Sequence, residues 1–241
     1  MRRYWILIVG LLLPAYAFSG RPLNTEDAAV AGKGVVQIEF SWDVFHYPHA
    51  LTDHTPLLVP IYGLTSRLDV MLDIPYTFRQ TPEGNRLHGW NDVVVSAKYL
   101  IVSGSRRLPA LATLVSLKTR TGDERQGLGS GALDGAVILA ATYTHRRWTG
   151  HGMLGWILVG NDADQVSLGA AGEYRISPTL SAVAELTADQ SPGQLRQGVF
   201  SAMFGLYYTL SPRAVLDLGI RRGIDNHRPI WHLTVGTSLT L

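Results

Sequence analysis

Several small groups of side chains in this sequence have the types and spacing that chemistry requires. Asp162 and Asp164 form an Asp-x-Asp pair, and Asp225 and His227 form an Asp-x-His pair. A carboxylate or an imidazole within hydrogen-bond reach of a water molecule can act as its general base, so these pairs allow a hydrolase as one interpretation. Because both spacings arise easily by chance in polar loops, solvated loop charge is the simpler explanation, and no catalytic residue is assigned.

Histidines and glycines suggest two further kinds of site, which the surrounding sequence does not support. His46, His49 and His54 lie close together and could bind zinc or copper if the chain folded around them. Neighbouring prolines favour an irregular exposed loop instead, so no metal site is expected. Residues 119–131 are glycine-rich, but no helix follows to complete a phosphate cradle. No cofactor is expected.

The largest group consists of charges that recur on one face of alternating segments. The carboxylates are Glu39, Asp43, Asp69, Asp73, Asp92, Asp134, Glu173, Glu185, Asp189 and Asp217, and the bases are Arg79, Lys98, Lys118, Arg175 and Arg221. Buried charges must be paired or wet, so this set predicts either an interlocked polar interior or a water-filled passage. The residues that we expect to line a passage, with a mildly acidic character that favours neutral or cationic solutes, are Asp43, Asp73, Asp92, Lys98, Lys118, Glu185 and Asp217.

The segments that carry these charges have the period of β-strands. From Val36 to Val44, and again from Leu68 to Phe78, apolar residues alternate with polar ones. Because successive side chains on a strand point to opposite faces, each segment has one apolar and one polar face. Many segments run for about ten residues, which is near the length that a tilted strand needs to cross a bilayer.

The connections between these segments alternate between short and long. Tight turns are predicted at Gly63–Ser66, Ser103–Arg107, His145–Arg147, Ser177–Thr179 and Ser211–Arg213. Longer loops are predicted at His46–His54, Gln80–Gly89, Thr119–Gly131, Gly160–Asp164, Gln190–Gln197 and Arg222–Arg228. Short periplasmic turns that alternate with longer outer loops are typical of outer-membrane barrels.

Aromatic residues gather at both ends of the segments. Beside the tight turns are Tyr62, Tyr99, Tyr143, Trp148, Tyr174 and Tyr208, and beside the long loops are Phe45, Tyr76, Phe78, Trp90, Phe200 and Trp231. Two such groups predict the girdles of a membrane barrel. The fold class is therefore all-β, a transmembrane antiparallel up-and-down β-barrel of about twelve strands, closed because lipid cannot satisfy an open edge. A soluble sandwich would leave the girdles and the unequal loops unexplained.

The first residues predict export from the cytoplasm. Arg2 and Arg3 precede an apolar run from Tyr4 to Leu13, and the small residues around Tyr16 follow it. This is the order of a secretory signal peptide, and the run is too short for a retained membrane helix. We assign a signal peptide to residues 1–17, an N-terminal segment to 18–34 and the outer-membrane barrel to 35–241. The segment at 18–34 lacks the alternation, and it either fills the barrel as a plug or lies in the periplasm.

Composition excludes several functions. The net charge of +2 without a basic run argues against nucleic acid as a partner. The absence of cysteine excludes thiolate metal sites and cysteine nucleophiles. Charged residues make up 17% of the chain, below the roughly 25% of an ordinary soluble domain. Such a deficit fits a surface that lipid partly covers.

Short motifs resemble one known family. Residues 21–28, Arg-Pro-Leu-Asn-Thr-Glu-Asp-Ala, are similar to the opening of the outer-membrane transporter family associated with the meta-pathway of phenol degradation. The turn at 62–69, Gly-Trp-Asn-Asp at 89–92 before Ala-Lys-Tyr at 97–99, and the glycine-rich stretch at 121–131 resemble it as well. One departure is the terminal Thr240-Leu241, since outer-membrane strands often finish on an aromatic residue. The resemblance implies a porin-like barrel that moves small, often aromatic or hydrophobic, compounds.

Together these features favour an outer-membrane channel or transporter for the passive uptake of small molecules, without enzymatic activity. The expected partners are outer-membrane lipid, lipopolysaccharide and a small-molecule solute, and a monomer is expected rather than a trimer. Two alternatives stay open: a non-conducting structural or surface-interaction barrel, and an omptin-like hydrolase that uses the acidic and Asp-His pairs at its rim.

Overall fold

The computed structural model describes residues 20–48, 51–160, 162–190, 199–224 and 230–241, which are largely β-strand. The strands are β1 (Val36–His46), β2 (Thr52–Gly63), β3 (Leu68–Gln80), β4 (Arg86–Trp90), β5 (Val94–Val102), β6 (Ala110–Lys118), β7 (Asp134–His145), β8 (Trp148–Leu158), β9 (Gln165–Arg175), β10 (Leu180–Gln190), β11 (Val199–Ser211), β12 (Ala214–Gly223) and β13 (Trp231–Thr240). A short 3-10 helix, η2 (Glu124–Gln126), lies between β6 and β7. In this part of the chain no helix has the length and apolar character to cross a membrane. The predicted signal peptide lies outside the described residues.

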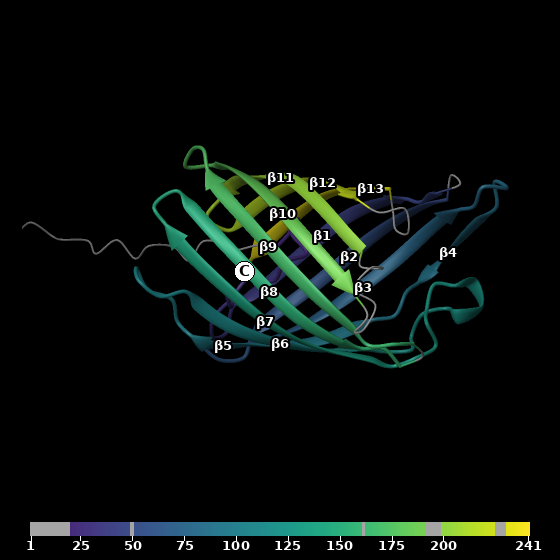
Figure 1. Ribbon diagram of the computed structural model, residues 1–241, viewed down its shortest axis with the longest axis horizontal. Coiled ribbons are helices and arrows are strands. Elements are labelled where there is room, and N and C mark those ends of the chain that lie inside the picture. The colour runs from purple at the N-terminus through teal and green to yellow at the C-terminus, as the bar shows by residue number, and fades with distance from the viewer. Residues whose placement is uncertain (1–19, 49–50, 161, 191–198, 225–229) are drawn as a thin grey trace, which may run out of the picture.

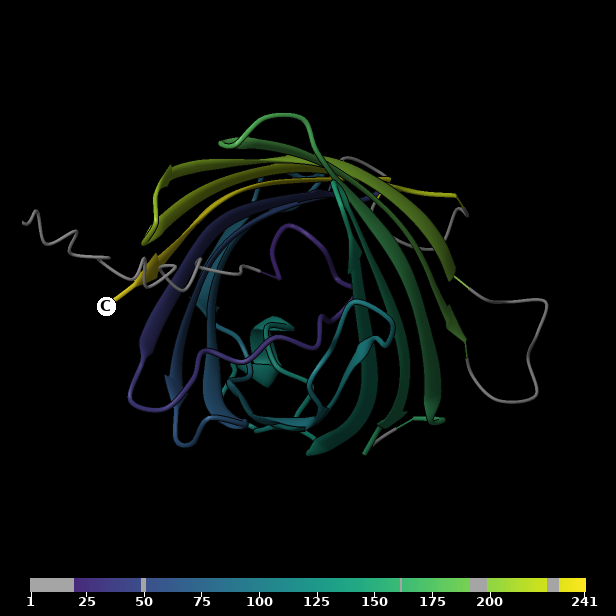
Figure 2. The same ribbon diagram turned by 90° about the vertical axis from the view of Figure 1, so that its left-hand side faces the viewer.

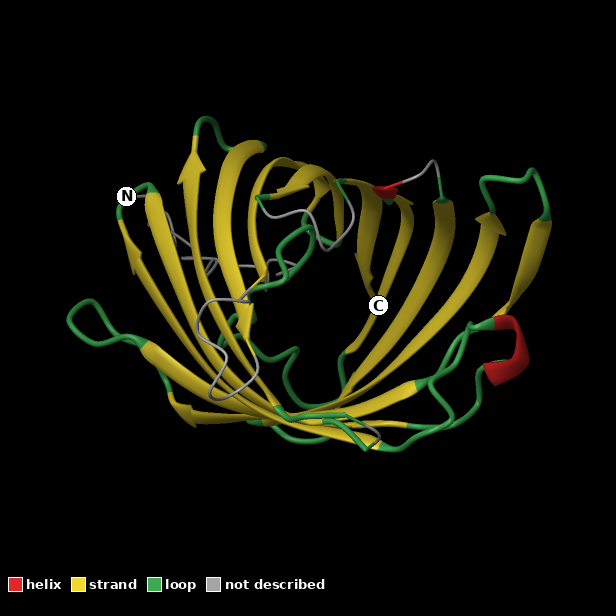
Figure 3. Ribbon diagram, turned by 45° about the vertical axis from the view of Figure 1, so that its right-hand side comes forward, coloured by secondary structure: helices red, strands yellow, loops and turns green. Residues whose placement is uncertain are grey.

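Twelve of the thirteen strands close into an antiparallel barrel. Consecutive strands pair along the sheet, and β1 pairs with β13 and β2 with β3 to complete the ring. β4 is the exception, because it pairs with the outer end of β3, while the inner end of β3 pairs with β5. The tilted strands are visible in Figures 1 and 3, and Figure 1 shows β4 beyond the ring. The predicted barrel class and strand number are confirmed.

Side chains alternate across this wall, apolar outside and polar inside. Phe204, Leu186 and Val235 are 66%, 62% and 57% exposed, whereas Ser41 and Ser238 are completely buried. A water-soluble domain would bury its large apolar side chains. The inverse distribution is that of a barrel whose outer face contacts hydrocarbon, and the protein is accordingly a barrel of the bacterial outer membrane.

The two ends of the barrel differ in their connections. Most connections at the end where Gln37 pairs with Thr240 are tight turns, and most connections at the opposite end are longer. The exception at the first end is the connection between β5 and β6, which spans residues 103–109 and is longer than the predicted turn. Two predicted loop boundaries were wrong. The loop predicted at His46–His54 is only residues 47–51, because His46 still pairs with Thr52, and the loop predicted at Gln80–Gly89 contains most of β4. Strand pairing beyond the bilayer needs no apolar alternation, so the ladder continues after the sequence pattern ends.

Most of the predicted girdle residues face outward. Tyr62, Tyr99 and Trp148 are exposed near the tight turns, as are Phe78 and Trp231 near the long loops. The prediction that Phe45 belongs to the girdle was wrong. This residue occupies an inward position of β1, and its ring stacks on that of His232 at 4.2 Å between centroids. Phe45 does lie beside a long loop, as predicted, but its position in the alternation of β1 makes its side chain point inward and not toward lipid.

Candidate functional site

Residues 20–34, which we call the plug segment, lie inside the barrel. They form no strand, and Figure 2 shows them in purple, crossing the interior within the ring of strands. Gly32 and Gly34 have φ values of +92° and +77°, a conformation that glycine adopts without a steric cost. These glycines allow the chain to leave the interior and turn into β1.

Arg21 holds the beginning of the plug segment. Its Nη2 donates to Thr234 Oγ1 at 2.6 Å and lies 3.6 Å from Asp43 Oδ1, and its Nε lies 4.0 Å from Asp217 Oδ1. Asp43 also contacts His232, whose Nε2 lies 2.8 Å from its Oδ1. One guanidinium therefore connects three wall strands, β1, β12 and β13, to the segment.

The middle of the plug segment binds through its backbone. Thr25 N–H donates to Glu185 Oε1 at 2.5 Å, and Ala28 N–H donates to Thr142 Oγ1 at 2.9 Å. The other carboxylate oxygen of Glu185 pairs with Arg221 Nη1 at 2.7 Å. Because a buried N–H without an acceptor is costly, these wall side chains replace the strand partners that the segment lacks.

The end of the plug segment interacts with β3 and β5. Lys98 Nζ lies 2.8 Å from Glu26 Oε2 and 3.5 Å from Asp27 Oδ1. Asp69 Oδ2 accepts a hydrogen bond from Ala31 N–H at 2.7 Å. Charges on the segment thus meet opposite charges or polar groups on the wall.

Glycines on the wall leave room for the plug segment. A Cβ added to Gly169 would lie 2.5 Å from Thr25 Oγ1, and one added to Gly219 would lie 2.9 Å from Pro22 Cβ. Gly205 and Gly236 are similarly close to Pro22 and Arg21. A glycine within a strand often marks a close approach of another backbone. Here bare backbone on β9, β11, β12 and β13 forms the seat for residues 21–25.

A second polar cluster holds the loop between β6 and β7 at the outer end. Asp92 accepts from Gly122 N–H at 2.9 Å and from Ser130 N–H at 2.8 Å. Lys118 Nζ lies 3.5 Å from Asp92 and 2.5 Å from Asp134. Burial by itself would raise the pKa of Asp92, but the two N–H donors and Lys118 together lower it from its usual value. The loop is therefore bound to a carboxylate that is ionised at neutral pH.

The seven residues predicted to line a passage fall into these two groups, with one exception. Asp43, Lys98, Glu185 and Asp217 contact the plug segment. Asp92 and Lys118 hold the outer loop. Asp73 has the inward parity of Asp69 and Thr77 on β3 and belongs to neither group. A role for these residues in conduction stays a prediction.

The sequence interpretation did not identify the residues of the plug segment that complete the site. Arg21, Glu26 and Asp27 supply its charges, and their segment was left as either a plug or a periplasmic extension. The glycines on the inward faces of the strands indicated such a contact, because glycine weakens a strand and often marks the close approach of another backbone. Those positions could have been read as a seat for another piece of backbone.

The other candidate sites are not assembled in the described residues. His46 and His54 lie in β1 and β2, His49 lies outside the described residues, and no group of three or more metal-ligating side chains occurs in the part that the structure describes. Asp164 accepts from Trp156 Nε1 within its own hairpin. Asp225 and His227 lie outside the described residues, so the Asp-His pair stays untested.

Solved structures with the same architecture are outer-membrane proteins. An outer membrane channel from Pseudomonas putida F1 is 16% identical, with a TM-score of 0.62 over 89% of this chain and 97% of that chain. The KdgM porin is 10% identical, with a TM-score of 0.60 over 84% of this chain and 98% of its own. The NanC porin is also 10% identical, with a TM-score of 0.56 over 86% and 100% of the two chains. At these identities the likeness establishes the fold.

Comparison by sequence gives one match. The model of the family described as "Putative MetA-pathway of phenol degradation" matches residues 19–241. No curated protein matches the chain.

Proposed function

The chain belongs to the MetA-pathway family of phenol degradation, and from that premise we propose that it is an outer-membrane channel through which small molecules diffuse passively. Small aromatic or hydrophobic compounds are the proposed solutes. The channel needs no cofactor in this proposal, and it acts as a monomer surrounded by lipid and lipopolysaccharide. No catalytic step is part of the proposed function.

The separable plug segment is the observation that carries this proposal. Residues 20–34 contribute no strand to the ring, so their removal breaks none of the backbone pairs that close it. The ion pairs of Arg21 and Lys98 join the segment to the wall. If the segment leaves, Asp43, Asp217 and Lys98 lose these partners, and charges in a low-dielectric interior then require water. Withdrawal of the plug segment would thus produce a hydrated passage.

The wall charges suggest which solutes such a passage favours. The wall groups that hold the plug segment include the carboxylates of Asp43, Asp69, Glu185 and Asp217. Among the wall residues that contact the plug segment, Lys98 is basic. The positive charge of Arg221 partly offsets the negative charge of Glu185. Rings of carboxylates favour cations over anions in pores. We therefore propose a preference for neutral and cationic solutes, with Asp43, Asp73, Asp92, Lys98, Lys118, Glu185 and Asp217 lining the path.

Planar-bilayer recording tests the proposal. The wild-type barrel is expected to show discrete openings, and a variant that lacks residues 21–33 is expected to show a larger unitary conductance. Both proteins are first checked for folding by the shift in electrophoretic mobility that barrels show on heating. If neither folded protein conducts at any voltage, the result would support the non-conducting structural barrel instead.

A further inference from the structure

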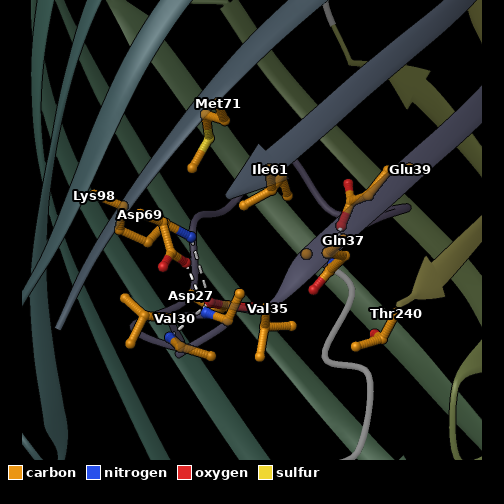
Figure 4. Close-up of a pocket in the computed structure, with 13 residues that line it drawn as sticks. Asp27, Val30, Val35, Gln37, Glu39, Ile61, Asp69, Met71, Lys98 and Thr240 are labelled. Carbon is orange, nitrogen blue, oxygen red and sulfur yellow. Dashed lines mark hydrogen bonds and ion pairs between the residues drawn. The ribbon is translucent and has the colours of Figure 1, made fainter. Parts of the chain in front are cut away.

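A cavity of about 200 Å³ lies between the plug segment and the wall near the tight-turn end. Its wall side comes from β1, β2, β3, β5 and β13. Its other side comes from Gly20, Asp27 and residues 29–31 of the plug segment and from Val35, just before β1. Figure 4 shows Ile61 and Met71 between Asp69 and Lys98 on one side and Gln37 and Glu39 on the other. The cavity exists only where both parts of the chain meet.

The charged groups around the cavity do not balance. Asp27, Glu39 and Asp69 line it, and Lys98 is its one basic lining residue. The ammonium of Lys98 is already engaged by Glu26 and Asp27. Counting these two pairs and Asp69, three acidic side chains face one ammonium, and Glu39 lies across the cavity as a fourth acidic group.

Two of these carboxylates, Asp69 and Glu39, lack a cationic partner among the described residues. Asp69 is 3% exposed, and its Oδ1 is buried without a hydrogen-bond partner among the described residues. Glu39 is 7% exposed, and its Oε1 accepts from Gln37 Nε2 at 2.8 Å. Neither forms an ion pair within 4.0 Å in the part of the chain that the structure describes. An unpaired buried carboxylate is costly, and a cation would offset that cost.

Apart from Gln37 and Thr240, the rest of the lining carries no polar side chain, and the cavity has the size of a small molecule. Val30, Val35, Ile61 and Met71 supply the apolar surface. A cavity of roughly 150 Å³ holds a benzene molecule, so this one has room for a single ring with a short polar substituent. An inorganic cation would leave the apolar surface unused.

We propose that this cavity binds a small amphiphilic cation, which places its positive group at Asp69, in the negative potential to which Glu39 contributes, and its apolar body against Ile61 and Met71. The inference rests on the proposed function, because it names the solute class that the channel holds at its plug segment. Since the plug segment supplies five of the thirteen lining residues, such a solute binds the plugged barrel and is lost together with the plug.

Calorimetric titration of the full-length barrel in detergent tests this inference. The probes are benzylammonium, benzyl alcohol and benzoate, which share one ring and differ in charge. Benzylammonium is expected to bind at least about tenfold more tightly than benzyl alcohol, which is the range of a charge-assisted hydrogen bond, and benzoate is not expected to bind. Deletion of residues 21–33 is expected to abolish binding.

Two matched variants locate the site. Asp69→Asn is expected to weaken benzylammonium binding at least about tenfold while leaving benzyl alcohol unchanged. Asp53→Asn removes an inward carboxylate of β2 that pairs with Arg79 and lies outside the cavity lining, and it is expected to leave both affinities unchanged. If Asp69→Asn does not fold, Glu39→Gln tests the same potential from β1.

Equal binding of the three probes, or no binding of benzylammonium, would overturn the inference, as would equal effects of Asp69→Asn and Asp53→Asn. Conductance separates this failure from that of the proposed function. A barrel that conducts but binds no benzylammonium keeps its function and loses this site. A barrel that binds benzylammonium at Asp69 but never conducts keeps the site and loses its role as a channel.

Discussion

Replacement of Glu185 by alanine is expected to release the plug segment. Glu185 accepts the Thr25 N–H at 2.5 Å, and the two residues are 3% and 1% exposed. A hydrogen bond to a charged group contributes about 1.5–3 kcal/mol, and this one exists only while the segment is seated. Because about 1.4 kcal/mol changes an equilibrium tenfold, Glu185→Ala is expected to raise the unseated-to-seated ratio roughly 10- to 150-fold.

The loss of the second contact of Glu185 is expected to shift this ratio in the same direction. Its pairing with Arg221 joins two wall strands and is present whether or not the segment is seated. Breaking a buried pair by removing one partner is expected to destabilise the whole barrel by about 3–5 kcal/mol. Because water can reach the unpaired Arg221 once the segment has left, part of this cost is relieved by plug release, so the ratio given above is a lower limit.

A unique thiol measures the release directly. The chain contains no cysteine, so Thr25→Cys introduces a single reactive group beside Gly169. The rate of its labelling by a maleimide is expected to rise by the factor above when Glu185→Ala is added. Asp53→Asn is the control, because it breaks the wall pair with Arg79, 2.7 Å apart, without contact to the plug segment. An unchanged rate in Glu185→Ala, or the same increase in Asp53→Asn, would refute the reasoning.

Three further changes test other parts of the structure. Gly169→Val should displace Thr25 and increase unitary conductance in planar bilayers, whereas Gly172→Val, whose added Cβ would meet nothing within 4 Å, should not; equal conductances would contradict the proposed seat. Lys118→Met leaves Asp92 facing a second carboxylate and should expose the loop between β6 and β7 to trypsin, so unchanged proteolysis would argue against this anchor. Leu186→Arg puts a charge on the lipid face and should lower the free energy of unfolding in urea by about 2–4 kcal/mol; a neutral effect would mean that this position does not contact hydrocarbon.

Local periodicity made the barrel predictable. The alternation of Val36, Ile38 and Phe40 with polar residues reflects the geometry of one strand, and Phe40 is indeed exposed while Glu39 is buried. The same rule assigned the inward faces of Asp43, Glu185 and Asp217. Strand number and the unequal ends follow from the same pattern together with the turn residues.

The sequence by itself therefore determined the class of fold, the face on which each charge lies and the family resemblance that the match over residues 19–241 bears out. Only the tertiary structure decided what those charges meet. Arg21 reaches Thr234 across 213 positions of the chain, and Thr25 packs against Gly169 of β9. Periodicity is a property of a few consecutive residues, whereas these contacts arise once the sheet has closed around the segment. For that reason the alternation could not choose between a plug and a periplasmic extension.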